Sequence, residues 1–333
     1  VGVTSGPICS PPSGSNFSVG TTTVTCTATD AAGNVGTGSF TVTVILEGGD
    51  TTSTINPPTP ASQSFSMSIT GNEGNSARID SSGIYVQDSY NIKRLDFSGN
   101  VLSTITLDPG GPALPNISFV LDSDHNMYVL NWDKTIRKYE AITGNYLGVF
   151  ANVSNASGEG IGIDASNNVY ASSGFFSGCW SICSVQVFAQ PTSGVAGNLI
   201  NTITLPAFDG RSFDVDPSGN IYIIDAPYTY SKYSSSGSFL NYIGPTGQSS
   251  EPGVHDAPTS SRHGITIHNS KVYTHEVDKY NVYDTSGNFL DLTLPVPDDS
   301  RWLAVDSAGN FYHSQSGTAG LPERIWVLPP NSV

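Results

Sequence analysis

Charged side chains are scarce in this sequence. Asp, Glu, Lys and Arg make up 12 % of its 333 residues, about half the share found in an average globular domain. Basic residues are the rarer kind, since 13 Lys and Arg stand against 28 Asp and Glu and leave a formal net charge of −15. Nucleic acids and anionic lipid surfaces are bound by clustered Lys and Arg, so the composition excludes both as expected partners.

Long apolar runs are also missing, and cysteines are few. No run approaches the roughly 18 apolar residues that a membrane-spanning helix requires, so no membrane span is expected. The four cysteines lie in two local pairs without the neighbouring ligands of a zinc site. An even number in a charge-poor chain favours an oxidising compartment, and we expect two disulfides, Cys9–Cys26 and Cys179–Cys183. Val1 is not a natural start, so we expect a mature product or a fragment.

The sequence does contain a phrase that is repeated six times. Each copy reads as a hydrophobic strand, a turn of the Asp-x-x-Gly-Asn kind, and a second strand that begins with an aliphatic residue or Met or Phe followed by Tyr; the fullest copy runs from Val215 to Tyr222. The six turns begin at Asp80, Asp122, Asp164, Asp216, His268 and Asp306. Successive turns are 42, 42, 52, 52 and 38 residues apart. A repeat of this length with several strands per copy is typical of a β-propeller.

The number of strands in each copy predicts the number of blades. The Tyr strand is followed by a third strand, a second Gly-containing turn and an outer strand, so the six copies predict a six-bladed propeller over residues 61–333. The sixth copy lacks its outer strand, and we expect the alternating segment 64–69 to close the ring there. No segment has a helical period, and the predicted fold class is all-β. The segment Asp216 to Asp225 is similar to NHL-type propeller repeats, a resemblance that implies a fold rather than a function.

Residues 1–46 form a separate unit. Segments 17–30 and 39–45 alternate between polar and apolar residues, as half-buried strands do. The unit resembles the C-terminal half of a hyalin repeat, and the residues that carry the resemblance are Cys9 to Ser15, Val19 to Asn34 and Phe40 to Val44. This resemblance implies a partial immunoglobulin-like β-sandwich and an extracellular adhesion or spacer module.

The first strands of that family are missing here. Half a sandwich leaves one face of its sheet uncovered and its edges unpaired. We therefore expect another subunit or an upstream segment to complete the unit, and strand donation between subunits would generate a filament. Residues 47–60, rich in Gly and then in Pro, are predicted to be a linker with a stiff, extended end.

The repeated Asp and Tyr residues look like a functional ring, but their pattern favours a structural role. An Asp at this position accepts hydrogen bonds from backbone N–H groups further along the turn, and Gly and Asn tolerate the left-handed conformation that the turn needs. His268 replaces the Asp in the fifth copy, which a shared catalytic role would not easily allow. The repeated Tyr is expected in the core or between blades.

Polar residues at one end of the inner strands are the candidate ligand-binding set. Counting along the repeats places them near the mouth of the central channel: Arg211, His263, Arg301, Asp88, Asp225 and Glu276. Convergent polar groups in a cavity are the default binding-site hypothesis. Arg and carboxylate groups also neutralise one another, so the alternatives are a wet funnel without a ligand, a site for a small ligand or ion, and a catalytic site.

No metal, cofactor or enzymatic activity is predicted. The histidines match no zinc motif, and the chain has no nucleophile elbow, phosphate loop or calcium loop. Phe175, Phe176 and Trp180 lie in a long insertion in the third repeat and are candidate interface residues, with coverage of a blade edge as the alternative. Four sequons allow N-glycosylation, at Asn16, Asn116, Asn152 and Asn155.

These features together predict an extracellular or cell-surface structural protein. Its expected work is protein–protein contact in adhesion or filament assembly, through self-association of the N-terminal unit. The alternative function is a propeller that binds carbohydrate or another small ligand. A metal-dependent lyase is less favoured, because the fold alone does not imply the activity.

Overall fold

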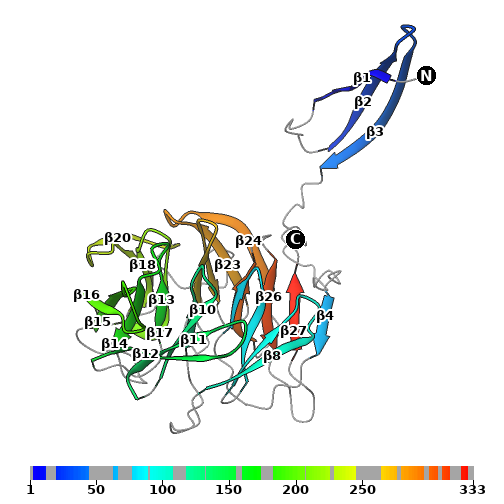
Figure 1. Cartoon of the computed structure of the whole chain (residues 1–333). Helices are drawn as coiled ribbons and strands as arrows, with labels where there is room; N and C mark the ends of the chain where they lie inside the picture. Colours follow the sequence, from blue (N-terminus) through cyan, green and yellow to red (C-terminus); the bar gives the residue numbers. More distant parts are fainter. Residues whose placement is uncertain are drawn as a thin grey trace. The chain divides into compact units, whose positions relative to one another are not determined.

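Strands make up every regular element that the computed structural model describes (Figure 1). The described residues are 3–12, 20–44, 63–66, 77–88, 91–107, 118–131, 133–154, 160–173, 183–206, 208–225, 229–244, 264–275, 279–295, 300–306, 310–315 and 324–328. The chain divides into two compact units, Val1–Pro58 and Thr59–Val333.

The N-terminal unit contains one antiparallel sheet, whose strands lie in the order β1 (Val3–Ser10), β2 (Gly20–Asp30) and β3 (Val35–Val44). The β2–β3 hairpin turns at Asp30, whose Oδ1 accepts hydrogen bonds from the backbone N atoms of Ala32 and Asn34, each at 2.9 Å. Gly33 adopts the left-handed φ of 85° that this turn needs. The second sheet of the predicted sandwich is not among the described residues.

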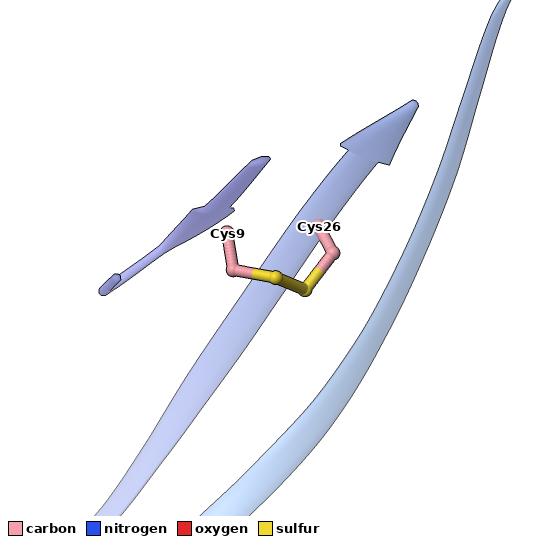
Figure 2. The surroundings of a disulfide bond; sticks show 2 residues. All are labelled: Cys9 and Cys26. Carbon is pink, nitrogen blue, oxygen red and sulfur yellow. A yellow bond between two sulfur atoms is a disulfide. The ribbon is translucent and has the colours of Figure 1, made fainter. Parts of the chain in front are cut away.

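The predicted Cys9–Cys26 disulfide is present and joins β1 to β2 (Figure 2). The two cysteines are directly opposite each other in the strand register. β1 is therefore attached to the sheet by a covalent bond as well as by its backbone hydrogen bonds. Cys179 lies outside the described residues, so its disulfide with Cys183 stays a prediction.

The larger unit consists of six four-stranded antiparallel sheets, which are the blades. The first five blades follow the chain order, each from its inner to its outer strand. Blade 1 is β5 (Ala77–Asp80), β6 (Gly83–Asp88), β7 (Asn91–Leu95) and β8 (Val101–Thr106); blade 2 is β9 (Ser118–Leu121), β10 (Asn126–Leu130), β11 (Thr135–Glu140) and β12 (Tyr146–Asn152); blade 3 is β13 (Ile161–Ile163), β14 (Val169–Ser173), β15 (Cys183–Ala189) and β16 (Asn198–Leu205); blade 4 is β17 (Phe208–Val215), β18 (Ile221–Asp225), β19 (Thr229–Tyr233) and β20 (Phe239–Tyr242); blade 5 is β21 (Gly264–His268), β22 (Lys271–His275), β23 (Lys279–Asp284) and β24 (Phe289–Pro295).

Blade 6 combines strands from both ends of this unit: β25 (Ser300–Val305), β26 (Phe311–Gln315), β27 (Arg324–Leu328) and β4 (Gln63–Ser66). β4 pairs antiparallel with β27 and overlaps the segment 64–69 that the sequence offers as a closing strand. The inner strands contact one another in succession, and β25 contacts β5, so the six blades form a closed ring. The predicted all-β, six-bladed propeller is confirmed.

The repeated Asp turn is held together by its own carboxylate. In blade 2, Asp122 Oδ1 accepts hydrogen bonds from the backbone N atoms of Asp124 at 2.9 Å and Asn126 at 2.8 Å. Its Oδ2 accepts one from Asn126 Nδ2 at 2.8 Å and lies 2.9 Å from Tyr128 OH. Bonds from the Asn and Tyr recur at Asp164, Asp216 and Asp306. These contacts support the structural role expected for the turn carboxylates.

The hydrophobic core of the propeller lies between neighbouring blades. One cluster joins Val120 and Tyr128 of blade 2 to Ile161 and Val169 of blade 3. Similar clusters join blades 1 and 2, 3 and 4, 4 and 5, and 6 and 1. The repeated Tyr is buried in all six copies, at Tyr85, Tyr128, Tyr170, Tyr222, Tyr273 and Tyr312. Each blade therefore depends on its neighbours for much of its stability.

Candidate functional site

Asp88 is the member of the predicted channel-mouth set whose side chain the structure describes. It ends β6, is buried, and its Oδ2 lies 2.5 Å from Lys93 Nζ on the adjacent strand β7. The carboxylate is therefore neutralised within its own blade. That the other five residues converge on the channel mouth stays a prediction. The structure describes the backbone but not the side chains of Arg211 on β17, Asp225 on β18 and Arg301 on β25. His263 and Glu276 lie outside the described residues.

Of the predicted sequon and interface residues, one is described by the structure and the rest are not. Asn152 is exposed at the end of β12, where its side chain is accessible for glycosylation. The remaining sequon and interface residues lie outside the described residues: Asn16, Asn116, Asn155, Phe175, Phe176 and Trp180.

Two opposite charges on the inner strands form a site that sequence reasoning missed. Arg78 lies on β5 of blade 1 and Asp214 lies on β17 of blade 4, three blades further around a closed ring of six. Each stands two residues before its turn Asp. The other blades carry Val120, Gly162, Thr266 and Ala304 at this position. Comparing this position across the six repeats is the sequence signal that identifies the pair.

Both of these charged side chains are half-buried. Burial lowers the pKa of Arg78 and raises the pKa of Asp214, and the opposite charge of each offsets part of the other's shift. Asp214 Oδ2 accepts a hydrogen bond from Ile267 N of β21, and its Oδ1 accepts one from Val215 N, each at 2.9 Å. The carboxylate therefore links blade 4 to blade 5, which is a structural use of a half-buried acid.

The sheet of the N-terminal unit has two chemically different faces. The β2–β3 register pairs Val24 with Phe40 and Thr23 with Thr41. Because alternate residues of a strand point to opposite faces, the register gathers most of the apolar residues on one face and most of the hydroxyl residues on the other. The apolar face carries Cys9, Thr22, Val24, Cys26, Ala28, Phe40 and Val42, and the hydroxyl face carries Thr23, Thr25, Thr27, Thr37, Ser39 and Thr41 together with Ile8 and Val35.

The apolar face is open in the part of the chain that the structure describes. Phe40 is 56 % exposed, and Val24 alone among the unit's described side chains is buried. Folded domains bury most of their Val and Phe side chains. Within its described residues, this unit therefore lacks a hydrophobic core of its own.

The apolar face carries no charge. Asp30 is the one charged side chain among the described residues of the N-terminal unit, and it lies in the hairpin turn. Hydrogen bonds, first of all from the side chain of Asn34, lower the pKa of this carboxyl group. This face therefore offers apolar contact and shape rather than charge.

The described residues contain no group of three or more His, Cys, Asp or Glu placed to hold a metal ion. Nor do they include a helix that is long and apolar enough to span a membrane. The exposed apolar face of β1–β3 is accordingly the candidate functional site with the best-defined chemistry.

Comparison with known proteins supports the fold of the larger unit. No similar sequence was found among the curated proteins. A solved streptogramin B lyase is 10 % identical, with a TM-score of 0.50 and coverage of 80 % of this chain and 96 % of that one. Virginiamycin B lyase from Staphylococcus aureus is 9 % identical (TM-score 0.51, coverage 80 % and 99 %), and U3-55K is 13 % identical (TM-score 0.52, coverage 79 % and 98 %). Likeness at these identities shows the fold alone and does not distinguish the NHL type.

A second comparison concerns the N-terminal unit. Residues 6–44 match the HYR domain family, which supports the hyalin-repeat resemblance of residues 1–46. Domains of this family occur in extracellular or cell-surface proteins, and they indicate an adhesion-type role. The chain therefore joins a HYR-type segment at residues 6–44 to a β-propeller of six blades.

Proposed function

We propose that this chain is an extracellular structural protein that works by protein–protein contact, in adhesion or filament assembly. The contact is made by the apolar face of β1–β3, and the propeller serves as a scaffold. The observation that carries the proposal is Phe40, a large apolar side chain that is 56 % exposed on the apolar face of the sheet. The HYR match supports the extracellular setting. The proposal assigns no enzymatic activity.

The energetics of the face favour its burial. Full burial of a Val or Phe side chain stabilises by about 1.5–3 kcal/mol. Phe40 is 56 % exposed and Val42 follows on the same face, half-buried, whereas Val24, opposite Phe40, is already buried. A second sheet that packs over the face at the usual spacing of about 10 Å removes the exposed parts of Phe40 and Val42 from water.

The occupant that we propose is a strand or sheet from another subunit. β3 is an edge strand of its sheet, and its residues Val35–Val44 include neither charge nor Pro. Natural proteins usually protect exposed edges with such residues, since an unprotected edge pairs readily with another chain. A contact of this kind between subunits builds an assembly, and an open head-to-tail contact extends it into a filament.

Phe40→Lys in the full chain tests the proposal, with Ser39→Lys as its matched control. Both add the same charge at neighbouring positions of β3, but Ser39 lies on the hydroxyl face. We expect the wild type and Ser39→Lys to associate as concentration rises in sedimentation experiments. Phe40→Lys should weaken that association at least about 10-fold, since a lost anchor costs 1.4 kcal/mol or more.

A wild-type chain that remains monomeric while its N-terminal unit is ordered contradicts the proposal. If an added upstream segment then covers the face and protects it from proteolysis, the occupant belongs to the same chain. Equal weakening by both substitutions would show that added charge, rather than the apolar face, controls association.

The alternative of a ligand-binding propeller has no comparable support. Asp214, one of the two central charges, already links two blades through its hydrogen bond to Ile267. The two lyases among the similar structures are 10 % identical or less to this chain, so their activities do not transfer. We therefore put forward no second function.

A further inference from the structure

A lysine and a glutamine from neighbouring blades meet beside a buried tyrosine. Lys138 lies on β11 of blade 2, and Gln190 follows β15 of blade 3. Lys138 Nζ is 3.3 Å from Gln190 Oε1, although the two residues are 52 positions apart in sequence. This contact places a primary amine, a nucleophile when uncharged, against a carboxamide.

Tyr128 contacts the same carbonyl oxygen. Its OH lies 2.8 Å from Gln190 Oε1 and 2.9 Å from Asp122 Oδ2, and its side chain is fully buried. Gln190 Nε2 donates a hydrogen bond to Asn167 O at 2.6 Å, which fixes the orientation of the amide. The glutamine carbonyl oxygen is therefore directed at both the phenol and the amine.

The surroundings act on the amine and on the phenol. Burial lowers the pKa of Lys138, an effect that the charges of Asp122 and Asp124 oppose. Burial and the charge of Asp122 raise the pKa of Tyr128, so the phenol keeps its proton and remains a donor. The single phenol proton is within reach of both Asp122 Oδ2 and Gln190 Oε1. When the phenol donates it to the carbonyl oxygen, it stabilises the negative charge that develops there during acyl transfer.

We propose that Lys138 and Gln190 react to form an intramolecular isopeptide bond. The uncharged Nζ attacks Gln190 Cδ, an Nζ–Cδ bond forms, and the Cδ–Nε2 bond breaks. Nζ loses one proton, and Nε2 gains one proton and departs as ammonia. The amine and the amide supply every atom and electron of this step, so it needs no oxidant, cofactor or second substrate.

Other blades have parts of this arrangement but lack the reacting amide. Lys232 of blade 4 lies 5.2 Å from the centroid of the Tyr222 ring, as Lys138 lies 5.0 Å from that of Tyr128. Its Nζ, however, faces the backbone O of Thr285 at 3.3 Å rather than a side-chain amide. The position in blade 1 is Arg94, which carries no primary amine. Lys232 is therefore a matched internal control.

The experiment is intact-mass spectrometry of the purified full chain after reduction of its disulfides. We expect a mass lower by one ammonia molecule than the mass that the sequence gives. Peptide mapping should recover one branched product that joins the segments around Lys138 and Gln190. A folded wild-type chain at its unmodified mass overturns the proposal, whatever the variants do.

Three variants identify the source of the lost ammonia. Lys138→Arg and Gln190→Met should both abolish the mass loss, because one removes the attacking amine and the other removes the acyl group. Lys232→Arg should leave the mass loss complete. Tyr128→Phe should slow the reaction by about 100-fold or more, since it removes the donor to the carbonyl oxygen. Ammonia loss that persists in Lys138→Arg comes from another amide and also overturns the proposal.

Discussion

Gly287 shows how closely neighbouring blades approach each other. It lies in the turn between β23 and β24 of blade 5, with a φ of 90°. Its backbone O accepts a hydrogen bond from Gly244 N of blade 4 at 3.0 Å. A Cβ atom at Gly287 would overlap with the backbone O of Tyr242 in β20. Glycine is therefore required here by the turn and by the contact between blades.

Gly287→Ala should destabilise the propeller by more than a left-handed backbone alone explains. The positive φ costs a side chain about 1–2 kcal/mol, and displacement of the neighbouring backbone adds about 1–3 kcal/mol. Gly194→Ala is the control, because Gly194 has a φ of 79° and open space around its Cβ position. Urea unfolding of both variants measures the difference. Equal losses of unfolding free energy would show that the blade contact is relaxed at no cost.

At the scale of the element, β4 has the most distinct role. It is the outer strand of blade 6, although it precedes blade 1 in the chain. Pairing between the first and last strands is the means by which a propeller closes its ring and protects the edge that would otherwise remain open.

Removal of β4 should therefore destabilise the ring. A chain that starts at residue 67 lacks the strand, whereas a chain that starts at Thr59 keeps it and serves as the control. We expect a lower melting temperature for the shorter chain, and aggregation through the exposed edge of β27. Circular dichroism during heating and light scattering check both effects. Identical melting of the two chains would mean that β4 contributes nothing to closure.

The elements that the sequence predicts best are those whose contacts are local. In the Asp216 turn, every stabilising hydrogen bond to the carboxylate comes from a residue at most six positions away, ending with Tyr222. The repeat therefore contains the turn, the second strand and the buried Tyr within a single short phrase. The disulfide between Cys9 and Cys26 is similarly local, at a sequence separation of 17.

Contacts between blades could not be predicted in the same way. Lys138 and Gln190 belong to different repeats, and their approach depends on the angle between two sheets. Counting along the repeats placed Asp88 at the channel mouth, but it could not reveal that Lys93 on the next strand reaches its carboxylate. Such side-chain partners are determined by rotamers and blade packing, which no repeat pattern specifies.

At the scale of the whole molecule, the two units differ in how they are stabilised. The propeller has buried clusters between blades, whereas the described part of the N-terminal unit has one buried side chain, Val24, and a disulfide. The disulfide closes a loop across a sequence separation of 17. A cross-link over a loop of that size contributes about 3 kcal/mol.

Replacement of both Cys9 and Cys26 by Ser should therefore affect the two units unequally. We expect the N-terminal sheet to lose its order and the proposed association to weaken. The main calorimetric transition, which comes from the propeller, should keep its melting temperature. Calorimetry and sedimentation of the same sample check both expectations. A large shift of the main transition would show that the propeller depends on the N-terminal unit.

The pairing of β4 with β27 also determines how the propeller responds to tension. Gln63, where the chain enters β4, is opposite Val327, next to the residue at which the chain leaves β27. A force that separates these two ends breaks the cross-strand hydrogen bonds in succession, starting from the pair at Gln63 and Val327. Blade 6 would therefore yield first and at low force, and the other five blades would remain folded as an open arc.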